Sequence, residues 1–241
     1  MKNILFFIIF CAITSISNAQ KHDNIWPMGY IGDTAASACN YVIDFRDSFT
    51  IIPKCLGIEF SNGNPHAAIC DTAGNLLFYT NGAYIADSSH QMMLNGDSLN
   101  NTGYAQYYEY GYPAEGIALP CPNNTEKYYL FHQERGLVPN AGGVVNFHTI
   151  KLNLTTIDMS LNNGLGAVTN KNQVILSDTM GGSGGGGYLK AAKHANGQDW
   201  WVLIPEWQSN AYYRFLVAED TVLGPYRQEV GPAFHWIDYN G

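Results

Sequence analysis

The sequence predicts an all-β protein, built as a propeller-like stack of short antiparallel sheets that forms a partial ring. Three observations lead to this fold class. Charged residues make up only 13% of the chain, and aromatic residues another 13%. No apolar period of 3.6 residues persists over a dozen residues, so amphipathic helices are not expected. Short runs rich in Tyr, Phe, Trp, Val and Ile recur instead, bounded by Gly, Asn, Asp and Pro, as is typical of strands joined by tight turns.

The charge balance excludes several classes of protein. The chain has 12 Lys and Arg residues against 20 Asp and Glu residues, which gives a net charge of −8. Coiled coils and charged disordered tails need far more charged residues than this. Because contacts with phosphates need clustered Lys and Arg side chains, we also expect no nucleic-acid partner.

The N-terminus has the three-part pattern of a secretory signal peptide. Lys2 is the only charged residue before Gln20, and residues 4–13 form an apolar run. That run is too short for a membrane span of about 20 residues. Ser17 and Ala19 place small residues at the −3 and −1 positions of a cleavage site between Ala19 and Gln20.

We therefore expect residues 1–19 to be removed and residues 20–241 to form one propeller-like β domain. The protein is expected to be secreted and to be extracellular or at the cell surface. No membrane span is expected in the mature chain, since no other apolar run approaches the required length.

Export changes the meaning of the cysteines, of which four remain after cleavage. Alternating residues in 41–45 and 49–53 predict a hairpin in which the numbers of paired residues sum to 94. That register places Cys39 opposite Cys55, at a spacing compatible with a disulfide worth about 3 kcal/mol. Pro53 could disturb the register, and the alternative is that all four thiols are free.

One unit repeats along the chain: an apolar strand, a polar turn, and a strand that opens with bulky apolar residues. It occurs at residues 66–80, 116–132 and 189–204, and third strands follow at 144–152 and 212–218. The second strands start at residues 76, 128 and 200, so they lie 52 and 72 residues apart. Repeats of about 40–50 residues with several strands each are typical of propeller blades.

An ordinary β-sandwich with irregular hairpins is the alternative that this spacing leaves open. Three to four units are few for a closed propeller, which typically has about 4–8 blades. A partial ring is therefore expected, and the pattern leaves open whether the domain is incomplete at its C-terminus.

The amino-acid sequences of these units resemble those of a known group of proteins. The segments are ICDTAGNLLFYTNGAYIAD (69–87), MLNGDSLN (93–100), YYLFHQER (128–135), IDMSLNNGLGAV (157–168) and KHANGQDWWVL (193–203). They resemble the N-terminal region of secreted Bacteroidota proteins that usually end in a type A sorting domain of the type IX secretion system. The resemblance covers residues 24–231 and implies a propeller-like fold and export past the outer membrane. It implies no catalytic residues. We expect no sorting domain within residues 20–241, which is a departure from the group.

Candidate binding residues crowd the end of the YYLFHQER strand. His132, Glu134 and Arg135 would bind a polar ligand if that end faced a propeller mouth, because function gathers at the ends of a rigid scaffold. The alternative is that these side chains are simply solvated at a rim.

No metal ion or cofactor is expected. None of the seven His residues are spaced i, i+2 or i, i+4, the spacings typical of zinc ligands. The glycines at 182–187 fit G-x-G-x-x-G after a strand-like stretch at 173–176. A dinucleotide site would need residues 188–195 to be a helix inside a βαβ unit, so an inter-strand loop is favoured.

These features predict a non-catalytic module that binds a protein or a glycan at the cell surface. The alternative is an exported glycan-active hydrolase or lyase on the same scaffold. The acids flanked by apolar residues are Glu109, Glu115, Glu134 and Glu206, and their spacing pairs none of them. Two carboxylates within roughly 5–10 Å at a pocket mouth would favour the enzyme, whereas rings along a groove would favour binding.

Overall fold

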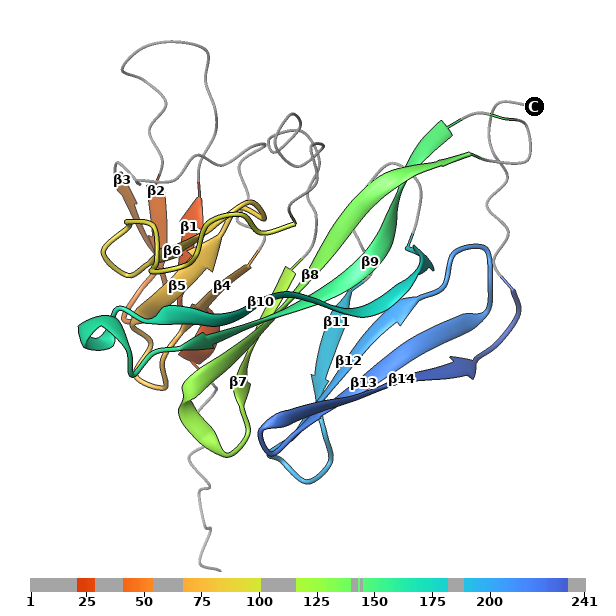
Figure 1. The fold of residues 1–241 in the computed structure, drawn as a ribbon. Helices are drawn as coiled ribbons and strands as arrows, with labels where there is room; N and C mark the ends of the chain where they lie inside the picture. Colours follow the sequence, from red (N-terminus) through yellow and green to blue (C-terminus); the bar gives the residue numbers. More distant parts are fainter. Residues whose placement is uncertain are drawn as a thin grey trace, which may run out of the picture.

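The structure, a computed structural model, describes residues 21–28, 41–53, 67–100, 116–139, 143, 145–181 and 189–233. In these ranges it is all-β, with four open antiparallel sheets whose strands follow one another in sequence order (Figure 1). The first two sheets contain β1 (Ile25–Met28), β2 (Tyr41–Asp44) and β3 (Thr50–Pro53), then β4 (Ala67–Cys70), β5 (Leu76–Thr80) and β6 (Ile85–Asp87). The third sheet contains β7 (Gly116–Cys121), β8 (Asn124–Pro139), β9 (Val145–Asp158) and β10 (Ala167–Met180). The fourth contains β11 (Lys190–Lys193), β12 (Trp200–Pro205), β13 (Ala211–Ala218) and β14 (Thr221–Glu229).

Helical structure is confined to two single turns in the described residues, Lys21–Asp23 and Asn162–Gly164. No helix in the part of the chain that the structure describes is long and apolar enough to cross a membrane.

The predicted repeat is confirmed at all three places. Strands β4 and β5, β7 and β8, and β11 and β12 each flank a polar turn, and the expected third strands are β9 and β13. The prediction lacks β1, β6 and β14, and it contains only the middle of β10. Residues 190–193 form strand β11, which pairs with β12 from Lys190↔Leu203 to Lys193↔Trp200, and not the helix that a dinucleotide site would need. The glycines at 182–187 lie outside the described residues.

The turn between β4 and β5 shows how the sequence fixes a hairpin. The backbone N–H groups of Ala73 and Asn75 each donate to Asp71 Oδ1 at 2.8 Å. Gly74 has φ +92°, a left-handed conformation that a residue with a Cβ rarely adopts. The Asp-Thr-Ala-Gly segment therefore has a structural role in the turn, as Asx turns do elsewhere.

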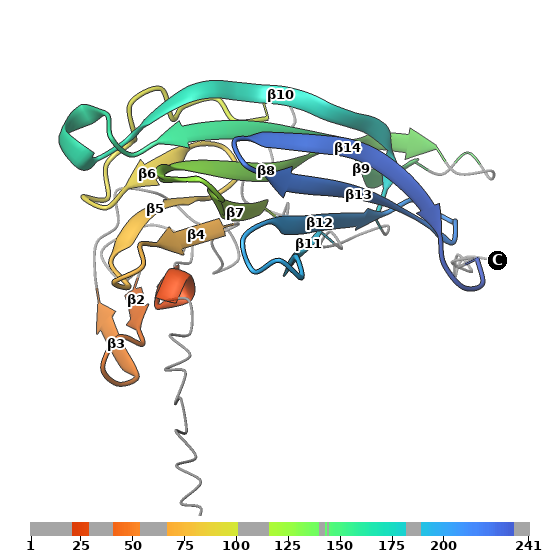
Figure 2. The same ribbon diagram turned by 90° about the horizontal axis from the view of Figure 1, so that it is seen from below.

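Each sheet shares an apolar layer with the next sheet along the chain. Ile25 and Val42 of the first sheet pack with Tyr79 of the second. Phe78 of the second sheet packs with Leu130 of the third in another layer. The last layer joins the third and fourth sheets, and Figures 1 and 2 show the third sheet lying between the second and the fourth.

Strand β8 is buried on both of its faces, which positions everything around it. Tyr128 and Leu130 belong to the layer shared with the second sheet, whereas Tyr129 and Phe131 belong to the layer shared with the fourth. Consecutive residues of a strand point to opposite faces, so this alternation assigns each face to a different neighbour. The result is an unbroken buried run from Tyr128 to Arg135.

The hairpin of β2 and β3 has the predicted register. Tyr41 pairs with Pro53 and Ile43 with Ile51, so Pro53 does not disturb the ladder. Cys39 and Cys55 lie outside the described residues, and their disulfide stays a prediction. Cys70 and Cys121 are buried free thiols.

We predict that Cys39 and Cys55 form the disulfide of the mature chain. Peptide mapping without reduction should yield one fragment that links the two residues, because continuing the ladder by two residues places them opposite each other. Cys70 and Cys121 should alkylate only after unfolding, since both are buried and burial raises the pKa of the Cys70 thiol to about 11. Alkylated Cys39 and Cys55 in the unreduced native protein would contradict the prediction.

Candidate functional site

The sequence-predicted candidates His132, Glu134 and Arg135 lie inside the molecule. Their exposed fractions are 2%, 7% and 8%, so the solvated-rim interpretation is wrong. They are in the middle of β8, where both faces of the strand are covered. Buried polar groups destabilise the fold unless they have hydrogen-bond partners, so the partners of these side chains determine their role.

His132 is satisfied by neighbours that fix its protonation. Its Nδ1 lies 2.6 Å from Asn100 Oδ1, and its Nε2 lies 2.9 Å from Thr155 Oγ1. Asn100 Nδ2 donates to the carbonyl of Gly82 at 3.2 Å, so the opposite end of that amide, Oδ1, must accept from His132. The backbone N–H of Asn172 donates to Thr155 Oγ1, which leaves the Thr155 hydroxyl to donate to Nε2.

His132 is therefore a neutral imidazole with its proton on Nδ1. Burial lowers the pKa of His132 to about 3. This group neither carries charge at neutral pH nor offers a free nitrogen to a ligand. Through its two hydrogen bonds, His132 links β8 to Asn100 and to Thr155 of β9. Thr155 in turn accepts from the backbone of Asn172, which links this group to β10.

Glu134 is held on the same face of the sheet. Its Oε1 accepts from Lys151 Nζ at 2.7 Å, and its Oε2 accepts from Asn153 Nδ2 at 3.4 Å. Asn153 Nδ2 also donates to Asn100 Oδ1 at 3.1 Å, which connects the ion pair to His132. His132 and Glu134 thus belong to one buried polar layer. Arg135 is also buried in β8, and it does not line the hollow described below.

Two buried amide atoms of β8 and β9, one on each face of the sheet, have no hydrogen-bond partner among the described residues. They are Gln133 Nε2 and Asn153 Oδ1, both fully buried. Gln133 is still held through its other end, where its Oε1 accepts from the Thr149 hydroxyl. Neither atom lines the hollow described below.

The candidate acids are only partly brought together. Glu109 and Glu115 lie outside the described residues, and Glu134 is bound to Lys151. Glu206, by contrast, shares a hydroxyl with a second carboxylate: Tyr213 Oη is within hydrogen-bond distance of Asp178 Oδ2 and 3.0 Å from Glu206 Oε1. The sequence contained no signal for this pair, because Asp178 lies near the end of β10 and Glu206 follows β12.

Arg227 determines the chemistry of this carboxylate pair. It donates from Nε to Glu206 Oε1 at 3.1 Å and from Nη2 to Glu206 Oε2 at 2.8 Å. The Arg227 hydrogen bonds are the largest cause of the lowering of the Glu206 pKa to about 2. Glu206 is thus ionised at neutral pH and is a poor proton donor, although one carboxyl of a glycosidase pair must be protonated.

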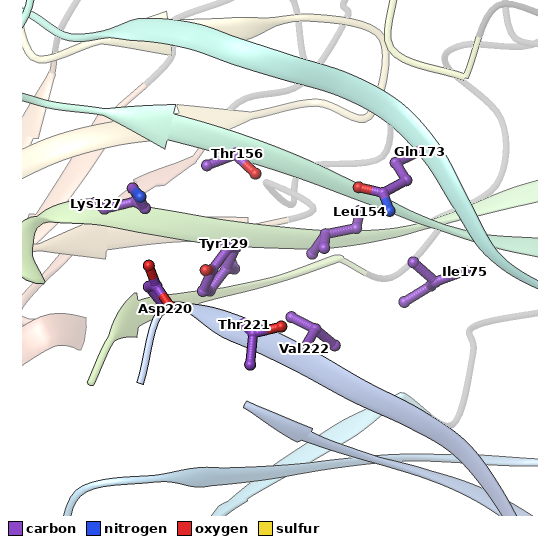
Figure 3. A pocket seen from close by; sticks show the side chains of 9 residues that line it. All are labelled: Lys127, Tyr129, Leu154, Thr156, Gln173, Ile175, Asp220, Thr221 and Val222. Carbon is purple, nitrogen blue, oxygen red and sulfur yellow. The ribbon is translucent and has the colours of Figure 1, made fainter. Parts of the chain in front are cut away.

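A hollow of about 250 Å³ lies between the third sheet and the hairpin of β13 and β14 (Figure 3). Its apolar surface comes from Tyr129, Leu154, Ile175 and Val222. Its polar surface is provided by five side chains from β8, β9, β10 and the β13–β14 hairpin: Lys127, Thr156, Gln173, Asp220 and Thr221. Aromatic and aliphatic walls with a few convergent polar groups are the usual composition of a small-molecule site.

Four of the five polar side chains that line the hollow are available to a ligand. Among the described residues, no hydrogen bond or ion pair engages the side chains of Lys127, Asp220, Thr156 or Thr221. Asp220 and Thr221 are exposed, while Lys127 and Thr156 are half-buried. An ammonium, a carboxylate and two hydroxyls therefore offer both donors and acceptors around one apolar surface.

A buried thiol holds the hairpin over the hollow. Cys121 Sγ, at the end of β7, donates to the carbonyl of Glu219 at 2.9 Å. Glu219 has φ +53°, the left-handed conformation that a two-residue hairpin turn requires. Asp220 is the other residue of that turn, so Cys121 positions the acidic side of the hollow.

No cluster of three or more His, Cys, Asp or Glu side chains suited to a metal ion occurs in the described ranges. No family model matches the chain, and comparisons with curated proteins and with solved structures also give no match. The fold and the hollow themselves define the class: an all-β chain of stacked antiparallel sheets with a small mixed-polarity hollow between two of them.

We predict that His132 makes stability depend on pH. The pKa of His132 is about 3 in the folded chain and about 6.5 in the unfolded chain, so the unfolded state binds the proton first as the pH falls. The contribution is fully present above pH 6.5 and is lost at about 1.4 kcal/mol per pH unit as the pH falls toward 3. Urea unfolding between pH 4.5 and 7 measures this loss.

The His132→Gln variant should unfold more easily at pH 7, by about 1–3 kcal/mol, because it cannot keep both hydrogen bonds. It should also lose stability less steeply than the native protein as the pH falls. The half-buried His194, changed to Gln, serves as the matched control and should keep the native slope. Equal slopes for the native protein and His132→Gln would show that His132 is not a buried neutral group.

Proposed function

We propose that this chain is an exported, non-catalytic surface module whose stacked sheets form a propeller-like partial ring and bind a glycan. The observation that carries the proposal is the hollow between the third sheet and the β13–β14 hairpin. A sugar ring presents apolar C–H faces and a rim of hydroxyls. The hollow offers Ile175 and Val222 to the former, and Lys127 and Asp220 to the latter.

The volume of the hollow suits one sugar unit. About 250 Å³ is slightly below the roughly 300–1,000 Å³ of sites that hold drug-sized ligands. A single unit of a longer chain would occupy it, with the remaining units extending into solvent. The nearby Lys127 and Asp220 differ in charge, so the hollow does not select for strongly acidic or basic ligands alone.

The propeller-like part of the proposal is supported by the way the sheets follow one another. All four are meanders, and each shares an apolar layer with the next sheet in sequence. Export is supported by the signal-peptide pattern of residues 1–19, and passage across the outer membrane only by the resemblance to secreted Bacteroidota proteins.

The second candidate is the exported glycan-active enzyme. The shared hydroxyl between Asp178 and Glu206 favours it, since the two carboxylates are close together. Two features weigh against it. The bidentate Arg227 keeps Glu206 ionised, and neither carboxylate lines the hollow. The cluster of Asp178, Glu206, Tyr213 and Arg227 is therefore best explained as a structural link between β10, the loop after β12, and β14.

Glycan binding is tested with the mature protein on a glycan array, followed by titration calorimetry with the glycan that binds. The Asp220→Asn variant should weaken binding about 10-fold, because it removes a charge-assisted hydrogen bond worth about 1.5 kcal/mol. Lys127→Gln should act similarly. Glu126→Gln is the control, since this exposed carboxylate lies beside Lys127 in sequence but outside the hollow.

The same preparation tests export, since protein secreted by a host should have the mass of a chain beginning at Gln20. Absence of any bound glycan, or binding that none of these substitutions alters, would contradict the proposed site. Release of reducing sugar that is lost in Glu206→Gln would support the enzyme instead. Capture of a protein ligand at the hollow in place of a glycan would also contradict the proposal.

A further inference from the structure

The first sheet leaves an aromatic face uncovered at one end of the stack. Trp26, Ile43 and Ile51 are cross-strand neighbours in β1, β2 and β3, so they share one face of the sheet. Ile25 and Val42 point the other way, into the layer shared with the second sheet. Trp26 is 44% exposed and Ile51 is 53% exposed.

Two rings from the β2–β3 turn extend this face. Phe45 follows β2 and Phe49 precedes β3, and Phe49 is 65% exposed. The rings of Trp26 and Phe45 meet edge to face with centroids 5.1 Å apart, and those of Phe45 and Phe49 lie 5.7 Å apart. We call Trp26, Ile43, Phe45, Phe49 and Ile51 the aromatic face.

The fourth sheet leaves a second apolar face partly uncovered at the opposite end. Val202 and Phe215 point into the layer shared with the third sheet. Trp201, Leu216 and Leu223 form a cross-strand row on the other side, and Leu223 is 42% exposed.

A positively charged side chain, Arg214, lies in the next cross-strand row on the same side. Arg214 pairs with Leu203 on β12 and with Tyr226 on β14, whose ring is 45% exposed. The Arg214 guanidinium lies 5.4 Å from the Trp201 ring centroid, and its Nε is buried with no hydrogen-bond partner among the described residues. We call Trp201, Arg214, Leu216, Leu223 and Tyr226 the arginine face.

From these two faces we infer that the chain associates with a second copy of itself, head to tail. The aromatic face of one copy packs on the arginine face of the other. The packing continues the pattern inside the chain, where each sheet covers the apolar face of its neighbour. The inference depends on the sheet stack and not on the ligand of the hollow.

Charge disfavours a symmetric pairing of two arginine faces and favours the head-to-tail arrangement. Two arginine faces packed on each other would bring Arg214 toward its own copy, and like charges repel in a desolvated interface. The aromatic face contains no charged side chain, and its rings can receive a guanidinium through their electron-rich faces. The described residues of two copies together contain eight sheets, which is at the upper end of the roughly 4–8 of closed propellers.

The test is sedimentation or light scattering of the mature protein across a concentration series. We expect an assembly of at least two copies that dissociates on dilution. Ile51→Glu on the aromatic face and Leu223→Glu on the arginine face should each reduce the assembly to single chains. Both side chains are exposed, so the folded monomer should survive, as circular dichroism would verify. Val174→Glu, at a 48% exposed position of β10 outside both faces, should leave the assembly intact.

Mixing the two monomeric variants gives the sharpest result. Each retains one intact face, so a mixture should form a heterodimer with one productive interface. A native chain that stays monomeric at high concentration would overturn the inference. So would a variant series in which only Leu223→Glu or only Ile51→Glu dissociates the assembly, because one face would then pair with itself.

Discussion

The structure depends on apolar layers that successive sheets share. An open sheet of three or four strands cannot cover its own apolar face, so it must pack on a neighbour. The third sheet meets this requirement twice, since β8 directs Leu130 toward the second sheet and Phe131 toward the fourth. Burying one such side chain contributes about 1.5–3 kcal/mol, so the alternation of β8 couples three of the four sheets.

The same constraint explains why a polar strand segment is buried. Residues that continue β8 beyond Phe131 remain covered on both sides, and they include His132 and Glu134. The chain keeps them there through a layer in which Asn100 and Asn153 each bridge neighbours. A polar layer with specific partners also fixes the register of β8 against β9, which apolar packing alone would fix less strictly. Because this layer is buried, the proposed function is assigned to the hollow, where Lys127 and Asp220 are accessible to a ligand.

Local patterns sufficed to predict much of the fold. The repeated strand, turn and strand are sequence-local, and so is the β2–β3 hairpin, whose register follows from alternation around a short turn. The burial of His132 could not be predicted, because a strand's own sequence does not say whether one or two of its faces will be covered. The hollow was also beyond prediction, since Lys127 and Asp220 come from different sheets and lie far apart in the sequence. Strand β14 was not predicted, because it is an edge strand whose side chains are mostly exposed. Its sequence therefore shows little alternation of apolar and polar residues.

The shared layers are tested most directly by native-state hydrogen exchange, followed strand by strand in increasing denaturant. If β8 couples its neighbours, the amides of β5, β8, β9, β12 and β13 should exchange together, with one free energy equal to that of global unfolding. A fourth sheet that opens at a distinctly lower free energy, while β8 and β9 keep their full protection, would show that the sheets fold as separate units and would contradict the account.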